Sequence, residues 1–221
     1  MKKYVNLFVF VFMIGACLSQ GRAQTKSAVS YKNPVVDIAM PDPTVIKAAD
    51  GYFYVYATES TRNVPIMKSK DLVEWTYCNT AFTNKTRPRF EPKAGIWAPD
   101  INYINGKYVL YYAMSVWGGE QTCGIGVATA NSPQGPFTDH GKMFRSNEIG
   151  VQNSIDPSLL QYEGRNYLVW GSFRGIYVIE LTADGLSIMS GAKKKRIAGT
   201  AFFEAVYIHK HGDYYYMFAS I

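Results

Sequence analysis

Apolar and polar positions repeat in one pattern four times along the chain: an acidic residue, an apolar stretch, a polar turn containing Gly, and a second stretch rich in aromatic residues. The four segments span 42–58, 100–113, 156–171 and 204–219. Their turns contain Asp-Gly, Asn-Gly, Glu-Gly and His-Gly pairs, flanked largely by β-branched or aromatic residues. Such residues favour strands, and a short turn with Gly between two strands favours a hairpin. Each segment is therefore predicted to be a β-hairpin.

The spacing of the repeats predicts a β-propeller. The acidic residues Asp42, Asp100, Asp156 and Glu204 are separated by 58, 56 and 48 residues, which is near the length of a four-stranded blade with its connections. Further strand-like stretches follow the first three hairpins and are predicted to be outer blade strands; they span 66–69, 124–130 and 176–181. No helix longer than a turn or two is expected after the N-terminal segment. The expected fold class is all-β.

The four acidic residues are expected to meet at one end of the propeller. The first strand of each blade lies nearest the central axis, so equivalent positions in successive blades are related by rotation about that axis. Turn preference explains one Asp at the start of a strand. Four carboxylates at one rim would repel and desolvate one another, which stability alone does not explain. The pattern therefore favours a functional cluster of carboxylates.

The composition excludes several classes of protein. Of the 221 residues, 48% are hydrophobic and 15% aromatic, with 3 Cys. That is enough apolar content for the core of one large domain and too little Cys for a disulfide scaffold. Without the three basic residues of the first 23, the net charge falls from +6 to +3, which does not indicate nucleic acid. The basic run 193–196 is interpreted as a solvated loop. Cys78 and Cys123 can pair or stay free, and both alternatives remain open.

Residues 1–23 are predicted to be a signal peptide. Two Lys precede an apolar run over 7–18, which is shorter than the roughly 20 residues that span a bilayer. Two processing sites compete: Ile14–Cys17 resembles a lipobox that would place a lipid on Cys17, and Gly21–Ala23 is typical of an ordinary signal peptidase site. The mature chain, residues 24–221, is expected to be periplasmic, a cell-surface lipoprotein or secreted, with no membrane-spanning segment.

The carboxylates indicate general acid and base chemistry. The sequence has no His-Glu-x-x-His, Cys-x-x-Cys or glycine-rich phosphate loop, and calcium binding by the carboxylates stays open. Glycoside hydrolysis needs one protonated and one ionised carboxyl group across a cleft. A third carboxylate nearby would raise the pKa of the acid. Trp97, Trp117 and Phe173 are candidates for stacking on sugar rings, with core packing as the alternative.

Four motifs follow one another in order: Met40–Pro43, Gly95–Asp100, Ser154–Ser158 and Phe203–Ala205. Together they resemble glycoside hydrolase family 43, whose members are five-bladed β-propellers that act on arabinan and xylan. The likeness extends over nearly everything after residue 33. Five blades need about 300 residues. This chain is therefore expected to hold about four blades, the last one incomplete, as a fragment or a truncated product.

The resemblance implies a role for each of three acids. Asp42 would be the general base that activates water, and Glu204 the general acid. Asp156 would tune the pKa of Glu204 and orient it. The family inverts the anomeric centre, which implies that the carboxyl groups of Asp42 and Glu204 lie roughly 6.5–9.5 Å apart. The expected substrate-binding residues are Asp100, Trp97, Ser172 and Phe173.

The resemblance also suggests a substrate. Ser154–Pro157 and Trp170–Phe173, followed by Gly175–Ile176, look most like endo-arabinanases, which cleave α-1,5 links between L-arabinofuranosyl units. The alternatives are an exo-acting β-xylosidase or α-L-arabinofuranosidase, and a non-catalytic glycan-binding propeller. The expected partner is plant cell-wall arabinan or arabinoxylan, bound by a monomer. No cofactor is expected to be required. Family arabinanases suggest a central calcium held with a His of a later blade, which is outside this chain, so no metal ligand is assigned.

Overall fold

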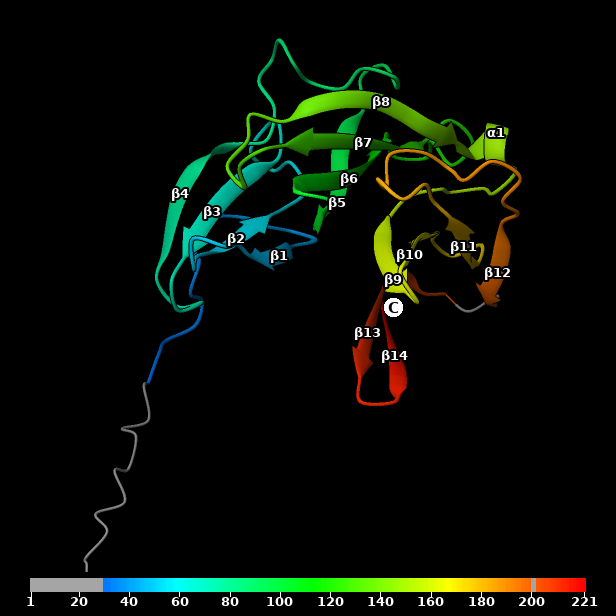
Figure 1. The fold of residues 1–221 in the computed structure, drawn as a ribbon. Helices are drawn as coiled ribbons and strands as arrows, with labels where there is room; N and C mark the ends of the chain where they lie inside the picture. The colour runs from blue at the N-terminus through cyan, green and yellow to red at the C-terminus, as the bar shows by residue number, and fades with distance from the viewer. Residues whose placement is uncertain (1–29, 200–201) are drawn as a thin grey trace, which may run out of the picture. The chain divides into compact units, whose positions relative to one another are not determined.

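The computed structural model describes residues 30–199 and 202–221, and Lys32–Ile221 form one unit. In this part of the chain the strands form three four-stranded antiparallel sheets and one two-stranded hairpin (Figure 1). The one helix described is α1, Ser146–Ile149, and none there could cross a membrane. The all-β prediction is confirmed. The predicted signal peptide and both of its processing sites lie outside the described residues.

The first two sheets correspond to the first two repeats. The first sheet contains β1 (Thr44–Lys47), β2 (Phe53–Tyr56), β3 (Pro65–Ser69) and β4 (Trp75–Thr80), paired in chain order. The second contains β5 (Gly95–Ile104), β6 (Lys107–Ser115), β7 (Gly124–Ala130) and β8 (Thr138–Arg145), also in chain order. Both sheets are the up-and-down meanders that the pattern predicts for propeller blades.

The third and fourth repeats form a complete sheet and a hairpin. The third sheet contains β9 (Ser158–Tyr162), β10 (Arg165–Trp170), β11 (Ile176–Glu180) and β12 (Lys195–Ala198). The hairpin contains β13 (Glu204–His211) and β14 (Tyr214–Ser220). All four predicted hairpins and the three predicted outer strands are therefore confirmed.

Two of the turns show why Gly recurs in the pattern. Ile104 pairs with Lys107, so the loop holds only Asn105 and Gly106, with φ of 48° and 82°. Glu163 and Gly164 form an equivalent turn, with φ of 49° and 75°. A two-residue turn with positive φ at both positions matches the twist of the strands, and Gly adopts this conformation without steric cost.

The first strands of successive sheets contact one another: β1 contacts β5, β5 contacts β9, and β9 contacts β13. Hydrophobic clusters fill the spaces between the sheets. One cluster joins the first two sheets through side chains such as Ile66, Phe82 and Leu110. A second joins the second and third sheets through Phe144 and Trp170. The acids in or next to these strands are thereby brought together, as the predicted rotational relation of the blades requires.

Candidate active site

The four first strands share a repeated backbone feature at the proposed site. Regular pairing with the second strand begins at Thr44 and Ser158, and it resumes after an irregularity at Asp100 and Tyr207. Two positions earlier in each case the backbone is left-handed, with φ of 49°, 41°, 55° and 52° at Asp42, Ala98, Asp156 and Ala205. Non-glycine residues adopt this conformation at a cost of about 1 kcal/mol or more, and such residues concentrate at functional sites.

This register corrects one prediction from the sequence. Asp42 and Asp156 occupy equivalent positions, but Asp100 lies two positions later and Glu204 one position earlier. The cause at Asp100 is an irregularity in β5, where the pairing shifts between Trp97 and Asp100. The four acids are therefore not in register, although all four reach the same region.

A cavity of about 520 Å³ lies where the four first strands meet. Each strand contributes three consecutive residues that begin at the left-handed position. The lining comprises Asp42–Thr44, Ala98–Asp100, Asp156–Ser158 and Ala205–Tyr207, together with Val45. Three of the predicted site acids, Asp42, Asp100 and Asp156, thus line one cavity. Glu204 directly precedes Ala205, the first of the three residues of β13 that line it.

Asp156 is the electrostatic centre of the site. Burial and, to a smaller extent, the nearby charges of Glu204 and Asp42 raise its pKa to about 7, while the hydrogen bond from the N–H of Ala205 acts in the opposite direction. That N–H donates to Oδ2 of Asp156 at 3.1 Å. Because neighbouring carboxylates repel each other as anions, the effect of Glu204 and Asp42 on the pKa of Asp156 shows that the three groups lie close together.

Asp42 and Glu204 each accept a hydrogen bond from a hydroxyl group. Thr58 donates to Oδ2 of Asp42 at 2.5 Å, and Ser172 donates to Oε2 of Glu204. Ser172 is fully buried, so it contacts Glu204 from the interior of the protein. A direct contact between Ser172 and a sugar stays a prediction.

Asp100 lies between the first three sheets. Its Oδ2 accepts hydrogen bonds from the N–H of Leu159 and from Asn102, both at 2.7 Å, and Thr44 donates to its Oδ1 at 3.5 Å. Burial raises the pKa of Asp100 to about 6, although these hydrogen bonds favour its ionised form. Asp100 thus ties β1, β5 and β9 together at the wall of the cavity.

The predicted aromatic residues lie outside the lining of this cavity in the described part of the chain. Trp97 is half-buried and packs against Ile155 and Ala113. Its ring centroid is 5.7 Å from that of Trp117, whose side chain is 94% exposed. Phe173 is 42% exposed, and its N–H donates to the carbonyl of Phe203. None of the three lines the cavity, so stacking on a sugar stays a prediction.

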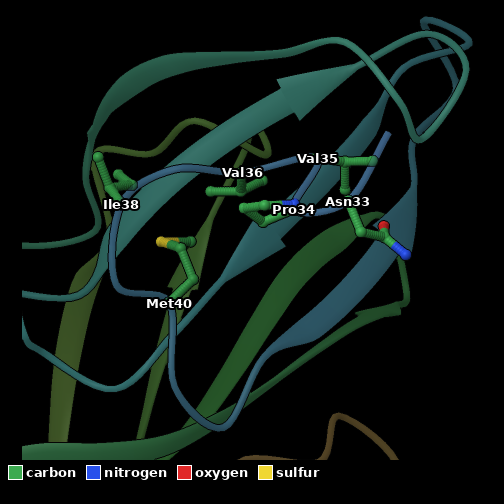
Figure 2. A pocket seen from close by; sticks show the side chains of 6 residues that line it. All are labelled: Asn33, Pro34, Val35, Val36, Ile38 and Met40. Atoms are coloured by element: carbon green, nitrogen blue, oxygen red, sulfur yellow. The ribbon is translucent and has the colours of Figure 1, made fainter. Parts of the chain in front are cut away.

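A second cavity, of about 610 Å³, lacks this chemistry. It is lined by Asn33, Pro34, Val35, Val36, Ile38 and Met40 (Figure 2). No side chain in this lining can donate or accept a proton near neutral pH, because its one polar group is an amide. The first cavity is therefore the candidate active site.

Comparison with known proteins identifies the family. The sequence profile of Glycosyl hydrolases family 43 matches residues 31–221. The chain belongs to glycoside hydrolase family 43. It adopts the all-β propeller fold of the five-bladed family structures over most of its length, and the predicted fold class is confirmed.

Several family 43 relatives have defined names. The extracellular endo-alpha-(1->5)-L-arabinanase 1 of Bacillus subtilis is 34% identical over 192 residues, covering 81% of this chain and 58% of that protein. An exo-1,5-alpha-L-arabinanase from a bovine ruminal metagenomic library superposes with a TM-score of 0.70 at 30% identity, covering 86% of this chain and 67% of that one. The Cellvibrio cellulosa alpha-L-arabinanase complexed with arabinohexaose gives a TM-score of 0.71 at 28% identity, covering 82% and 64%. The chain spans 57–66% of the length of the curated relatives it matches.

Sequence reasoning missed Thr58, although a signal for it was present. Since Thr44 pairs with Tyr56, continuing the ladder by two positions places Thr58 opposite Asp42. The predicted hairpin of the first repeat therefore contained this pairing. No comparable signal indicated that Ser172 would donate to Glu204, because this contact joins two different repeats.

The remaining sequence predictions concern metals and thiols. Among residues 30–199 and 202–221, no group of three or more His, Cys, Asp or Glu is arranged to hold a metal ion. The suggested calcium, held with a His of a later blade, stays a prediction, and no catalytic step is assigned to it. Cys78 and Cys123 are both free thiols, so the pairing alternative is wrong. Burial raises the pKa of each thiol, as expected of structural cysteines.

Proposed function

We propose that this family 43 protein hydrolyses α-1,5-linked L-arabinofuranosyl bonds in arabinan with inversion at the anomeric carbon. The observation that carries the proposal is the convergence of Asp42, Asp156 and Glu204 at one cavity, where two of these charges raise the pKa of the third. The names of the arabinanase relatives support arabinan as the substrate. Export also belongs to this proposal, since one relative is extracellular.

In the proposed reaction, Asp42 accepts a proton from a water molecule as the water oxygen bonds to the anomeric carbon. The glycosidic C–O bond breaks, and Glu204 transfers its proton to the departing oxygen. The products are a sugar with inverted configuration and a shortened chain. Asp156, which lies close enough for the charge of Glu204 to raise its own pKa, is proposed to orient the acid.

The aromatic side chains are proposed to bind the polymer on either side of the cleaved bond. Trp97 and the exposed Trp117 offer adjacent ring faces, and Phe173 offers another near Glu204. Apolar faces of sugar rings stack on such surfaces, because burying them removes apolar area from water. Asp100 is proposed to shape the floor of the site.

The products released from linear α-1,5-arabinan test the proposal. Endo-action releases oligosaccharides of mixed length early in the reaction, whereas the exo-action named for one similar structure releases a single short product. Proton NMR of the first product reports whether the configuration is inverted. Binding of arabinan without any hydrolysis would overturn the enzymatic proposal in favour of a glycan-binding propeller.

A variant of Glu204 tests its role as the acid. Glu204→Ala should lower kcat on arabinan by about 10²–10⁴-fold. The loss should be much smaller on a nitrophenyl α-L-arabinofuranoside, because nitrophenolate departs without a proton. Glu163→Ala, in the exposed turn of the third hairpin, is the control and should leave both rates unchanged. Equal losses on the two substrates for Glu204→Ala would show that Glu204 is not the proton donor.

A further inference from the structure

The two equivalent aspartates of the site face different residues across their hairpins. Extending the ladder places Thr58 opposite Asp42 and Gly171 opposite Asp156. Asp42 therefore accepts a hydrogen bond from a side-chain hydroxyl. Among the described residues, Asp156 accepts a hydrogen bond only from the backbone N–H of Ala205. Gly171 cannot be replaced by a larger residue without strain, because its φ is 125° and an added Cβ would lie 2.2 Å from the carbonyl oxygen of Gly175.

Three hydrogen bonds fix Thr58 in place. Its N–H donates to the carbonyl of Pro41 at 2.9 Å, next to Asp42 in the chain. Its Oγ1 accepts the N–H of Ala98, from the bulge of β5, at 2.7 Å. The same Oγ1 donates to Oδ2 of Asp42 at 2.5 Å.

The direction of the last bond follows from counting protons. A threonine hydroxyl carries one proton, and a backbone N–H can only donate. Because Ala98 donates to Oγ1, the hydroxyl proton of Thr58 is left to point at Asp42. Among the described residues, no other group donates to the Asp42 carboxylate, so its Oδ1 stays available.

We propose that Thr58 is a positioning residue that holds one oxygen of Asp42 and aims the other at the attacking water. This inference rests on the proposed function, in which Asp42 is the general base. A carboxylate that rotates freely would present either oxygen in many orientations, and misplacement by about 1 Å can cost up to about 100-fold in rate. Thr58 contacts neither sugar nor water in this proposal, so it acts through Asp42 alone.

Substitution of Thr58 should separate kcat from KM. Thr58→Val keeps the size of the side chain but removes the hydroxyl; on linear α-1,5-arabinan it should lower kcat by about 10–100-fold with KM within about twofold. Thr58→Ser restores the hydroxyl and should recover most of the rate. A Thr58→Val enzyme with unchanged kcat, or a Thr58→Ser enzyme as slow as Thr58→Val, would overturn the proposal.

Thr44 offers a matched control for the loss of stability that replacing a half-buried threonine hydroxyl causes. Its Oγ1 also accepts a backbone N–H of β5, from Ile101 at 3.3 Å, and donates to an aspartate, Asp100. Both threonines are half-buried and join the same two sheets. Thr44→Val should lower the unfolding temperature about as much as Thr58→Val. Thr44 lines the cavity but does not contact the proposed base, so any loss of arabinan binding should appear in KM, and kcat should fall far less than in Thr58→Val.

A double-mutant cycle with Asp42→Asn distinguishes positioning from a merely structural role. If Thr58 acts through Asp42, adding Thr58→Val to Asp42→Asn should cause little further loss of kcat, because the base is already removed. Adding Thr44→Val to Asp42→Asn should instead lower kcat by the same small factor that Thr44→Val causes in the wild type. An Asp42→Asn enzyme with full activity would overturn the proposed base. A different result is that Asp42→Asn reduces the activity greatly while the added Thr58→Val lowers kcat by as large a factor as it does in the wild type. That result would overturn only the role of Thr58.

Discussion

The second strands of the second and fourth repeats have nearly the same sequence pattern and opposite environments. In β6, every residue from Tyr108 to Ser115 is buried. In β14, with aromatic residues at matching places, every residue is exposed. Aligned on their hairpin turns, the fully buried Tyr112 corresponds to Phe218, whose side chain is 57% exposed. A similar strand is therefore a core element in one repeat and a surface in the other.

The difference arises from the neighbours of each strand. β6 pairs with β5 and β7, and its two faces belong to different clusters: Leu110 packs between the first two sheets, and Tyr111 packs between the second and third. Among the described residues β14 pairs with β13 alone. A strand that is apolar on both faces is typical of the interior of a layered fold. Local pattern therefore determines the hairpin, and the surrounding sheets determine its burial.

The largest expected effect compares Tyr112 with Phe218. Tyr112→Ala should lower the free energy of unfolding by about 3–5 kcal/mol, because it empties a site between Phe82 and Phe90. It also removes a hydrogen bond to Asp139. Phe218→Ala should change the free energy of unfolding by about 0.5 kcal/mol or less. Urea unfolding followed by tryptophan fluorescence measures both, and similar losses for the two variants would contradict the comparison.

The same comparison explains what the sequence could predict of the fold. The Gly turns and the alternation of apolar residues sufficed for all four hairpins and three outer strands, because these features act over a few residues. The bulge in β5, where the pairing shifts between Trp97 and Asp100, was not predicted from the local pattern. It moved Asp100 out of register with Asp42 and Asp156. The exposure of β14 depends equally on contacts between distant segments.

The second largest effect is expected at Asp156, between the third sheet and the hairpin of β13 and β14, and it concerns how stability depends on pH. Its pKa is raised from 3.8 to about 7, so between about pH 4 and pH 7 the folded protein holds a proton that the unfolded chain has released. The free energy of unfolding therefore falls as the pH rises through this window and levels off above it. Asp156→Asn removes this dependence and should be more stable than the wild type above pH 7. The gain should be on the order of 2 kcal/mol, since one pKa unit is worth about 1.4 kcal/mol and Asp156 retains some access to solvent.

Asp71 provides a control of opposite sign for this measurement. Hydrogen bonds from the N–H groups of Glu74 and Val73 lower its pKa, so it stabilises the folded protein at neutral pH and loses that contribution in acid. Asp71→Asn should therefore be less stable than the wild type at neutral pH, with the difference shrinking below about pH 4. Thermal unfolding from about pH 2 to about pH 8 measures both variants. A pH-independent difference for Asp156→Asn would show that its carboxyl does not titrate in this window.

The candidate site was predictable to a similar degree as the fold. Asp42 and Asp156 stand before Pro at the start of a hairpin, which is a local signal, and their convergence followed from the repeat. The hydrogen bond from Ser172 to Glu204 joins the loop after β10 to the start of β13, so no local pattern contains it. The residues that hold the acids in place were thus harder to predict than the acids themselves.

The smallest expected effect concerns this link between the hairpin and the third sheet. Ser172→Ala removes one hydrogen bond to Glu204 and should destabilise the hairpin locally by about 1 kcal/mol. Amide hydrogens of β13 and β14 should then exchange about fivefold faster, while those of β9 and β10 keep their rates. Ser115→Ala is the matched control, because Ser115 is also a buried serine, at the end of β6, but its hydroxyl donates to the carbonyl of the adjacent Val116 in its own repeat. Unchanged exchange in β13 after Ser172→Ala would mean that Val206, buried against Val169 and Ile176, anchors the hairpin without help from the site.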